Sequence, residues 1–174
     1  MYDVTATGEL LIDFTRNGFS KQDNRVYEAN PGGAPCNVLA MLGKLGYKTA
    51  FIGKVGEDEF GKLLKNTISE QKIDSTGLIL DPDAKTTLAF VDNDETGDRS
   101  FSFYRKPGAD MMLREDEVNY ELIDNCRIFH FGSLSMTDEP VRSATYAMVD
   151  YAKKKNKIIS FDPNLRPPLW ESED

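Results

Sequence analysis

The segment PGGAPCNVLAMLGKLGYKTAFI, residues 31–52, carries the most definite local pattern in the chain. Two glycines precede apolar residues at helical spacing, with Pro35 in the expected first turn and Gly46 at the expected stop. The following run, Thr49–Ile52, has the character of a buried strand. The segment therefore predicts a helix that leads into a buried strand. The apolar face expected on that helix comprises Val38, Leu39, Met41, Leu42 and Leu45.

Strand and helix patterns alternate on both sides of this segment. The near-continuous apolar runs RIFHF and KIISF are typical of parallel strands that are buried on both faces. A helix is expected between them, with Thr137 or Asp138 as its cap and Pro140 in its first turn. Further elements are expected as a strand at Tyr2–Thr7, a helix opened by Glu57, Asp58 and Glu59, and strands at Arg127–Phe131 and Lys157–Phe161.

A different pattern follows in the middle of the chain. The runs Thr86–Asp92 and Arg99–Arg105 flank residues 93–98, and polar and apolar side chains alternate in the second run. Such alternation is typical of an antiparallel hairpin with one solvated face. Residues 9–14 form a short apolar segment that ends near Asp13, and residues 15–30 suit a loop or an exposed hairpin. Together these patterns predict an α/β fold with a parallel sheet and a small β insert.

Composition excludes several classes of protein. The chain has 174 residues, of which 40% are hydrophobic, and this favours one globular domain. Its net charge of −8 argues against general binding of nucleic acid or anionic lipid. Two cysteines and one histidine exclude a zinc finger and argue against a disulfide scaffold, and no metal site is expected. No apolar run approaches the ~20 residues of a membrane span, and the N-terminus lacks a basic leader, so a cytoplasmic location is expected.

Two motifs point to chemistry that their other residues do not support. Residues 56–62 match the phosphate-loop pattern G-x-x-x-x-G-K, but Leu63 replaces the hydroxyl residue that would hold Mg²⁺. A turn followed by an acid-capped helix accounts for every residue there. Cys36 lies in a first helical turn, where a thiolate is stabilised. Its only candidate base, His130, lies within an apolar strand and is expected to be a packed histidine, which disfavours nucleophilic catalysis.

Two further clusters are candidates for ligand contacts. Gly32 and Gly33 either make a tight turn or let a ligand touch the backbone, and Asn37 follows one turn later. Asn164 and Arg166 follow the last predicted strand, at the sheet edge where open α/β sheets bind ligands. Arg166 could clamp a phosphate or carboxylate, or it could make a surface salt bridge.

Five segments together resemble one known family. GELLIDF, PGGAPCNVLAMLGKLG, FIGKVGEDEFG, FYRKPGADMML and FDPNLRPPLW are similar to segments of the PfkB (ribokinase-like) carbohydrate kinases, and most of all to the fructokinase branch. Ketodeoxygluconate kinases share a DPNLR-like segment. The resemblance implies a three-layer parallel sheet with helices on both faces. It also implies a small β-sheet lid from segments of about 9–31 and 85–110, with residues 1–174 as the N-terminal part of the kinase domain.

The resemblance also implies an activity and a set of site residues. The activity is transfer of the ATP γ-phosphate to a sugar hydroxyl with Mg²⁺, with fructose as the expected sugar and 2-keto-3-deoxygluconate as the alternative. Asn164 and Arg166 would stabilise the transferring phosphate. Phe90 would belong to the lid over the sugar. The sugar would be bound by Asp13, Gly32, Gly33, Asn37, Phe103 and Arg105.

One family feature is missing from these residues. The family carries its catalytic aspartate in a Gly-Ala-Gly-Asp segment, and no such segment occurs in residues 1–174. The chain is therefore expected to hold the sugar-binding half of the enzyme, to contain no catalytic residue of its own, and to be inactive in isolation. The alternative is a short non-catalytic sugar-binding or regulatory module. A small-molecule sugar is the expected partner, and a homodimer through the lid or an exposed sheet edge is expected.

Overall fold

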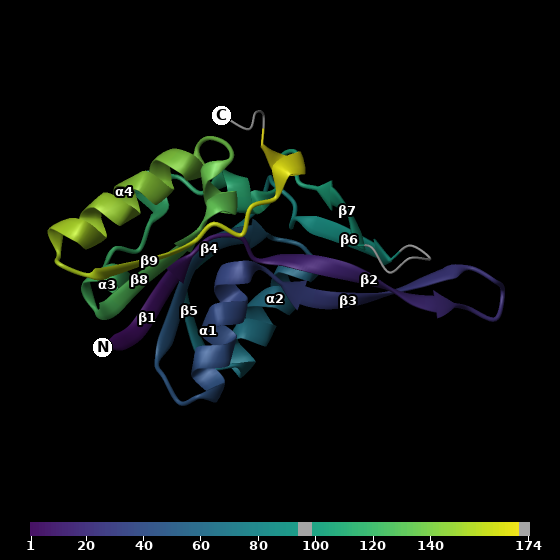
Figure 1. Cartoon of the computed structure of the whole chain (residues 1–174), viewed down its shortest axis with the longest axis horizontal. Helices are drawn as coiled ribbons and strands as arrows, with labels where there is room; N and C mark the ends of the chain where they lie inside the picture. The colour runs from purple at the N-terminus through teal and green to yellow at the C-terminus, as the bar shows by residue number, and fades with distance from the viewer. Residues whose placement is uncertain (94–98, 171–174) are drawn as a thin grey trace.

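Two β-sheets organise the protein, and the computed structural model describes residues 1–93 and 99–170 (Figure 1). The larger sheet has five strands in the order β5-β4-β1-β8-β9, and every neighbouring pair is parallel. Because parallel strands need crossover connections, helices lie between successive strands. The strands of this sheet are β1 (Tyr2–Thr7), β4 (Thr49–Gly56), β5 (Ile73–Asp81), β8 (Cys126–Gly132) and β9 (Ile158–Asp162).

Helices cover both faces of the larger sheet (Figure 1). On one face, α1 (Ala34–Lys44) and α2 (Glu59–Glu70) bury a core that includes Leu39, Phe51 and Leu64. On the other face, α3 (Glu121–Asp124) and α4 (Val141–Lys154) bury a second core around Phe129 and Met148. The predicted three-layer α/β arrangement is confirmed.

The second, smaller sheet has the strand order β3-β2-β6-β7 and projects from the body of the molecule (Figure 1). It pairs β2 (Leu11–Phe19) with β3 (Arg25–Gly32), and β6 (Leu88–Asn93) with β7 (Arg99–Tyr104), as two antiparallel hairpins. A parallel β2–β6 pairing joins them. The hairpin predicted between residues 86 and 105 is therefore present, and residues 15–30 form the hairpin rather than the loop. The connection was expected at residues 93–98; Asn93 ends β6, and residues 94–98 lie outside the described residues.

Two local features differ from the sequence predictions. Strand β5 was not predicted, because polar residues interrupt its apolar positions. Helix α4 begins at Val141 with Pro140 as its N-cap residue, not Thr137 or Asp138. The hydroxyl of Thr137 instead donates to the carbonyl of Leu134 at 3.0 Å and accepts from Arg105 at 2.9 Å, so it is not available as a cap.

The segment GKVGEDEFG has a structural role at the start of α2. The carboxylate of Asp58 accepts from the backbone N–H of Gly61 at 2.8 Å, which caps the helix. The same carboxylate accepts from the N–H of Thr86 at 2.9 Å and from its hydroxyl at 2.7 Å. Asp58 thus fastens the chain that leads into β6 to the start of α2. The segment is an acid-capped turn and not a phosphate loop.

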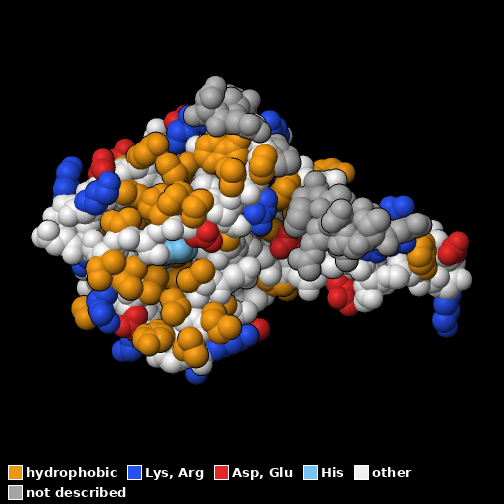
Figure 2. All heavy atoms as spheres, in the orientation of Figure 1, with side chains coloured by type: hydrophobic (Ala, Val, Ile, Leu, Met, Phe, Trp, Pro, Cys, Tyr) orange, Lys and Arg blue, Asp and Glu red, His pale blue; other side chains and the backbone are white. Residues whose placement is uncertain are grey.

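Apolar side chains remain uncovered beside β9, which pairs only with β8 among the described residues. Figure 2 shows hydrophobic side chains gathered around the single histidine, His130, on the face in view. Val38 and Met41 of α1 and Leu45 at its C-cap, all expected on a buried face, are 36%, 60% and 67% exposed. Ile158 of β9 is 59% exposed. Within the described residues, no helix is long and apolar enough to cross a membrane.

Candidate functional site

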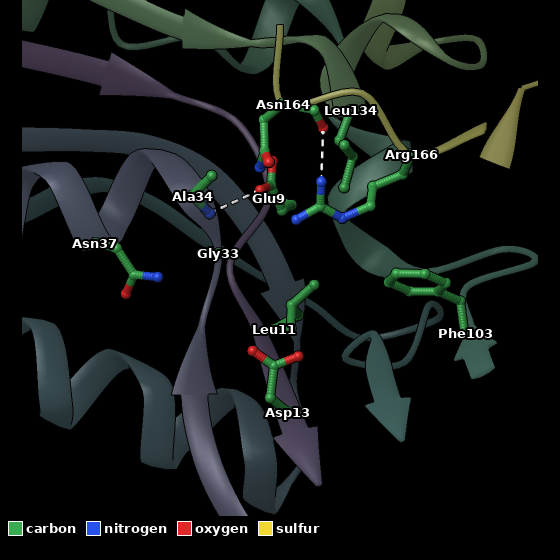
Figure 3. A pocket seen from close by; sticks show the side chains of 10 residues that line it. All are labelled: Glu9, Leu11, Asp13, Gly33, Ala34, Asn37, Phe103, Leu134, Asn164 and Arg166. Atoms are coloured by element: carbon green, nitrogen blue, oxygen red, sulfur yellow. Dashed lines mark hydrogen bonds between the residues drawn. The ribbon is translucent and has the colours of Figure 1, made fainter. Parts of the chain in front are cut away.

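A pocket of about 140 Å³ lies where the chain leaves β1, passes the N-terminus of α1 and enters the smaller sheet (Figure 3). The loops after β8 and β9 complete its wall, so it lies at the carboxyl edge of the larger sheet, where α/β folds bind ligands. Its volume is below the ~300–1,000 Å³ of common ligand clefts, so these residues alone enclose only a small ligand. The lining residues are Glu9, Leu11, Asp13, Gly33, Ala34, Asn37, Phe103, Leu134, Asn164 and Arg166.

The register of the smaller sheet decides which of its side chains face the pocket. Asp13 pairs with Ala89, and Ala89 pairs with Phe103, so these three residues share one face. Phe14 and Phe90 pair on the opposite face, where their rings stack with centroids 4.9 Å apart. Phe103 therefore lines the pocket. Phe90, expected as part of the lid, lies on β6 of this sheet, but its side chain is on the face opposite to Phe103.

Asp13 and Asn37 come from different elements and line the same pocket. Asp13 lies on β2, while Asn37 lies in the first turn and a half of α1 (Figure 3). Burial raises the pKa of the Asp13 carboxyl, and the positive charge of Arg166 opposes that rise. The arrangement brings a carboxylate and an amide to one pocket, and both groups can accept hydrogen bonds from hydroxyl groups.

The paired glycines have two different roles. Gly33 lines the pocket with a φ of 120°, and a Cβ there would lie 2.3 Å from the carbonyl oxygen of Glu9. Only glycine fits that conformation and that close approach. Gly32 is not among the lining residues, and a Cβ there would lie 2.2 Å from a carboxylate oxygen of Asp13. Gly32 therefore makes room for Asp13, and the expectation that it lets a ligand touch the backbone is not supported.

Arg105 was predicted to touch the sugar, but the structure places it behind the pocket wall. It is buried, and its Nε lies 2.7 Å from a carboxylate oxygen of Asp110. Its two terminal nitrogens donate to the hydroxyl of Thr137 and the carbonyl of Leu134, each at 2.9 Å. Asp110 also accepts from the hydroxyl of Thr87. Because Leu134 lines the pocket, Arg105 supports the wall from outside and its guanidinium is directed at internal partners.

The segment after β9 brings Asn164 and Arg166 to the pocket. Asp162 accepts from the N–H of Asn164 at 3.1 Å, and Asn164 has a positive φ of 32°, so the chain turns sharply there. The guanidinium of Arg166 donates to the carbonyl of Asn164 at 3.3 Å (Figure 3). Arg166 is the cation among the lining residues, where it can attract an anionic group and offset nearby carboxylates.

Glu9 is a lining residue that sequence reasoning missed. It is 3% exposed, and one carboxyl oxygen accepts from the backbone N–H of Ala34 at 2.8 Å. Burial raises the pKa of this carboxyl to about 7. The available signal was a charged residue next to the apolar pair Leu10–Leu11, directly after the first strand, where a side chain that is buried needs a polar partner.

Cys36 and His130 have no catalytic arrangement. Both are buried, and burial raises the pKa of the Cys36 thiol well above its usual value, with the charge of Glu9 adding to the rise. His130 Nδ1 lies 3.0 Å from the hydroxyl of Ser160 on the neighbouring strand, and burial lowers its pKa. Among the described residues, no cluster of three or more His, Cys, Asp or Glu side chains is placed to hold a metal ion.

The parallel five-stranded sheet, its two helical layers and the smaller sheet at its carboxyl edge define a ribokinase-like α/β protein. A family model for pfkB family carbohydrate kinases matches residues 1–174. The chain therefore belongs to the pfkB family of carbohydrate kinases, and the resemblance seen in the sequence is confirmed.

Three individual proteins show which members of the family this chain is similar to. The chain is 47% identical over 173 residues to the probable fructokinase-6, chloroplastic, of Arabidopsis thaliana, which covers 98% of this chain and 45% of that protein. It matches the structure of a fructokinase from Xylella fastidiosa with bound ATP, with a TM-score of 0.91, 35% identity, and coverage of 100% of this chain and 52% of that one. It also matches a fructokinase from Vibrio cholerae O395 in a fructose, ADP and calcium ion bound form, with a TM-score of 0.86, 35% identity, and coverage of 98% of this chain and 53% of that one. The chain thus spans about half the length of these proteins.

Proposed function

We propose that this chain is the sugar-binding half of a kinase that transfers the γ-phosphate of ATP to a hydroxyl group of a sugar. The observation that carries the proposal is the convergence of Asp13, Asn37, Gly33 and Phe103 on one pocket at the carboxyl edge of the sheet. Hydroxyl-rich ligands need several polar groups at fixed positions, together with an apolar wall for their carbon skeleton. These residues supply both, and the relatives named above are fructokinases.

The charges of the pocket favour a neutral sugar over a sugar acid. Glu9 and Asp13 bring two carboxyl groups to the lining, against the single cation of Arg166. An anionic substrate such as 2-keto-3-deoxygluconate would be repelled by the carboxylates, whereas fructose carries no charge. Fructose is therefore the proposed substrate.

The nucleotide fits these residues only in part. Arg166 and Asn164 offer a cation and an amide to a phosphate group, and a relative has been solved with ATP. The pocket volume of about 140 Å³ leaves no room for a nucleotide beside a sugar. The described residues also present no carboxyl cluster for Mg²⁺. No transfer step is therefore assigned to this chain, and we expect purified chain to form no product from ATP and fructose.

Calorimetric titration with fructose, ribose and 2-keto-3-deoxygluconate tests the proposal. We expect fructose to bind most tightly, and Asp13→Asn to weaken its binding about tenfold, because a charged acceptor forms a stronger hydrogen bond than a neutral one. Asp150→Asn, the same change at an exposed site on α4, is the matched control and should leave the affinity unchanged. Absence of sugar binding by the unaltered chain, or equal effects of the two variants, would refute the proposal.

The association of two copies and the cellular location of the chain remain predictions. The uncovered Ile158 and Phe161 of β9 favour pairing of two copies through this edge, and light scattering of the unaltered chain and of Ile158→Asp would test it. A dimer that persists in the variant would argue against this edge. The cytoplasmic location is likewise a prediction, because the Arabidopsis relative is itself named chloroplastic.

A further inference from the structure

The carboxyl group of Glu9 has one oxygen engaged by the protein and one without a protein partner. The first oxygen accepts from the backbone N–H of Ala34 at 2.8 Å, at the N-terminus of α1, where no side chain of the helix itself provides a cap. The second, Oε2, is buried and has no hydrogen-bond partner within residues 1–93 and 99–170. A buried acceptor without a partner is destabilising, so a ligand that supplies a donor there gains from it.

The location of Glu9 indicates the kind of ligand that can supply a hydrogen-bond donor to its Oε2. Glu9 lines the same pocket as Asp13 and Arg166, and Figure 3 shows its carboxyl group on the side of the pocket formed by Asn164 and Leu134. The site is concave and lies beside the residues proposed to bind a sugar. A sugar hydroxyl is both a donor and an acceptor, so it can pair with this oxygen whether or not the carboxyl group carries a proton.

We propose that Glu9 is a binding residue of the sugar pocket, which holds the start of α1 with one carboxyl oxygen and accepts a hydrogen bond from a hydroxyl group of the sugar with the other. The inference rests on the proposed function and adds a contact to it. It also gives a role to a carboxyl group at a position that is 3% exposed, where a fully apolar side chain would avoid the loss of hydration.

The protonation state of Glu9 gives a measurable signal for its proposed hydrogen bond with the sugar. Its pKa is raised to about 7, chiefly by burial and also by the charge of Asp110, whereas hydrogen bonds from the backbone and the charge of Arg105 act in the opposite direction. Asp13 and Arg166 are the other charged residues that line the pocket. The thiol of Cys36 is the remaining titratable group in its field, and its pKa lies well above this range. A hydroxyl donor favours the charged carboxylate, so sugar binding should lower the pKa of Glu9. By linkage, the affinity for fructose should then rise with pH through about 7.

The experiment is calorimetric titration of the 174-residue chain with fructose at pH 5.5 and 8.5, for the unaltered protein, Glu9→Gln and Glu59→Gln. Gln keeps an oxygen for the N–H of Ala34 but no longer ionises. Glu59 is 89% exposed on α2 and serves as the matched control. We expect Glu9→Gln to bind fructose about fivefold more weakly at pH 8.5 and to lose the pH dependence, because a charge-assisted hydrogen bond becomes a neutral one. Glu59→Gln should retain both the affinity and the pH dependence.

A second measurement needs no amino-acid substitution. In chain labelled with ¹³C at the glutamate carboxyl groups, the titration midpoint of Glu9 should move to lower pH when fructose is saturating. A midpoint that fructose does not move, or a Glu9→Gln affinity equal to that of the unaltered chain at both pH values, overturns this inference while leaving the proposed function in place. No fructose binding by the unaltered chain overturns both.

Discussion

Replacement of Arg105 by alanine tests whether this residue supports the pocket or touches the sugar. The structure pairs its guanidinium with Asp110 at 2.7 Å, and the two side chains are 3% and 2% exposed. Removal of one partner leaves a buried carboxylate without its counter-charge, which costs about 3–5 kcal/mol of unfolding free energy. The hydrogen bonds to Thr137 and Leu134, at 2.9 Å each, are lost in the same variant. We therefore expect a loss in the upper part of that range.

Urea unfolding followed by circular dichroism measures this loss. Arg127→Ala is the matched control, because Arg127 is 60% exposed and lies 3.7 Å from Asp3, so its loss should cost no more than about 1 kcal/mol. A double variant, Arg105→Met with Asp110→Leu, removes both buried charges. It should recover most of the stability that Arg105→Ala loses, because an apolar pair of similar volume needs no desolvated ions.

One combination of results would show that Arg105 does not act as a support of the pocket wall. If Arg105→Ala loses less than about 1 kcal/mol of stability, on the scale of an exposed pair, and abolishes fructose binding, then Arg105 contacts the sugar as the sequence predicted. A double variant that is no more stable than the single one would also show that Asp110 does not depend on Arg105 for its compensation.

Three further predictions follow from single contacts. Gly33→Ala should lower the free energy of unfolding in urea by about 3 kcal/mol or more, because its φ is 120° and a Cβ would clash with the backbone of Glu9. A loss below about 1 kcal/mol would contradict the observed turn. Asp58→Ala should lose about 2–3 kcal/mol, since it caps α2 and holds Thr86, whereas Glu57→Ala beside it should change stability little. Burial raises the folded pKa of Glu9 from 4.5 to about 7, so the folded state binds the extra proton between these values. Its contribution of about 3 kcal/mol should be present below pH 4.5 and lost as the pH rises to about 7. Unfolding free energies of Glu9→Gln should lack that slope, and an unchanged slope would reject the shifted pKa.

The contacts of the site explain why its residues were only partly predictable. Asp13, Asn37, Phe103, Asn164 and Arg166 were chosen from motifs, and all five line the pocket. Their common location follows from topology, because each lies at or beyond the carboxyl edge of the sheet or on the smaller sheet next to it. A motif indicates that a residue type matters, but it does not show which way the side chain points.

Arg105 and Glu9 show most directly which features of the site motifs do not predict. Both are charged residues within recognisable segments, yet their roles depend on partners distant in sequence. Arg105 meets Thr137 across 32 positions, and Glu9 meets Ala34 across 25. Strand β5 was missed for a related reason: its pairing with β4 holds it in the sheet although its own pattern is weak.

The amino-acid sequence by itself determined the alternation of strands and helices, the antiparallel insert and the membership of a kinase family. The strands and helices could be predicted because backbone periodicity and one-sided burial leave a local record in the order of apolar residues, whereas the family was identified from the similarity of five sequence segments. Only the tertiary structure decided that Phe90 faces away from the pocket, that Arg105 lies behind its wall and that Glu9 lines it. Those outcomes depend on strand register and on which buried charges find partners, and both are settled by packing between distant segments.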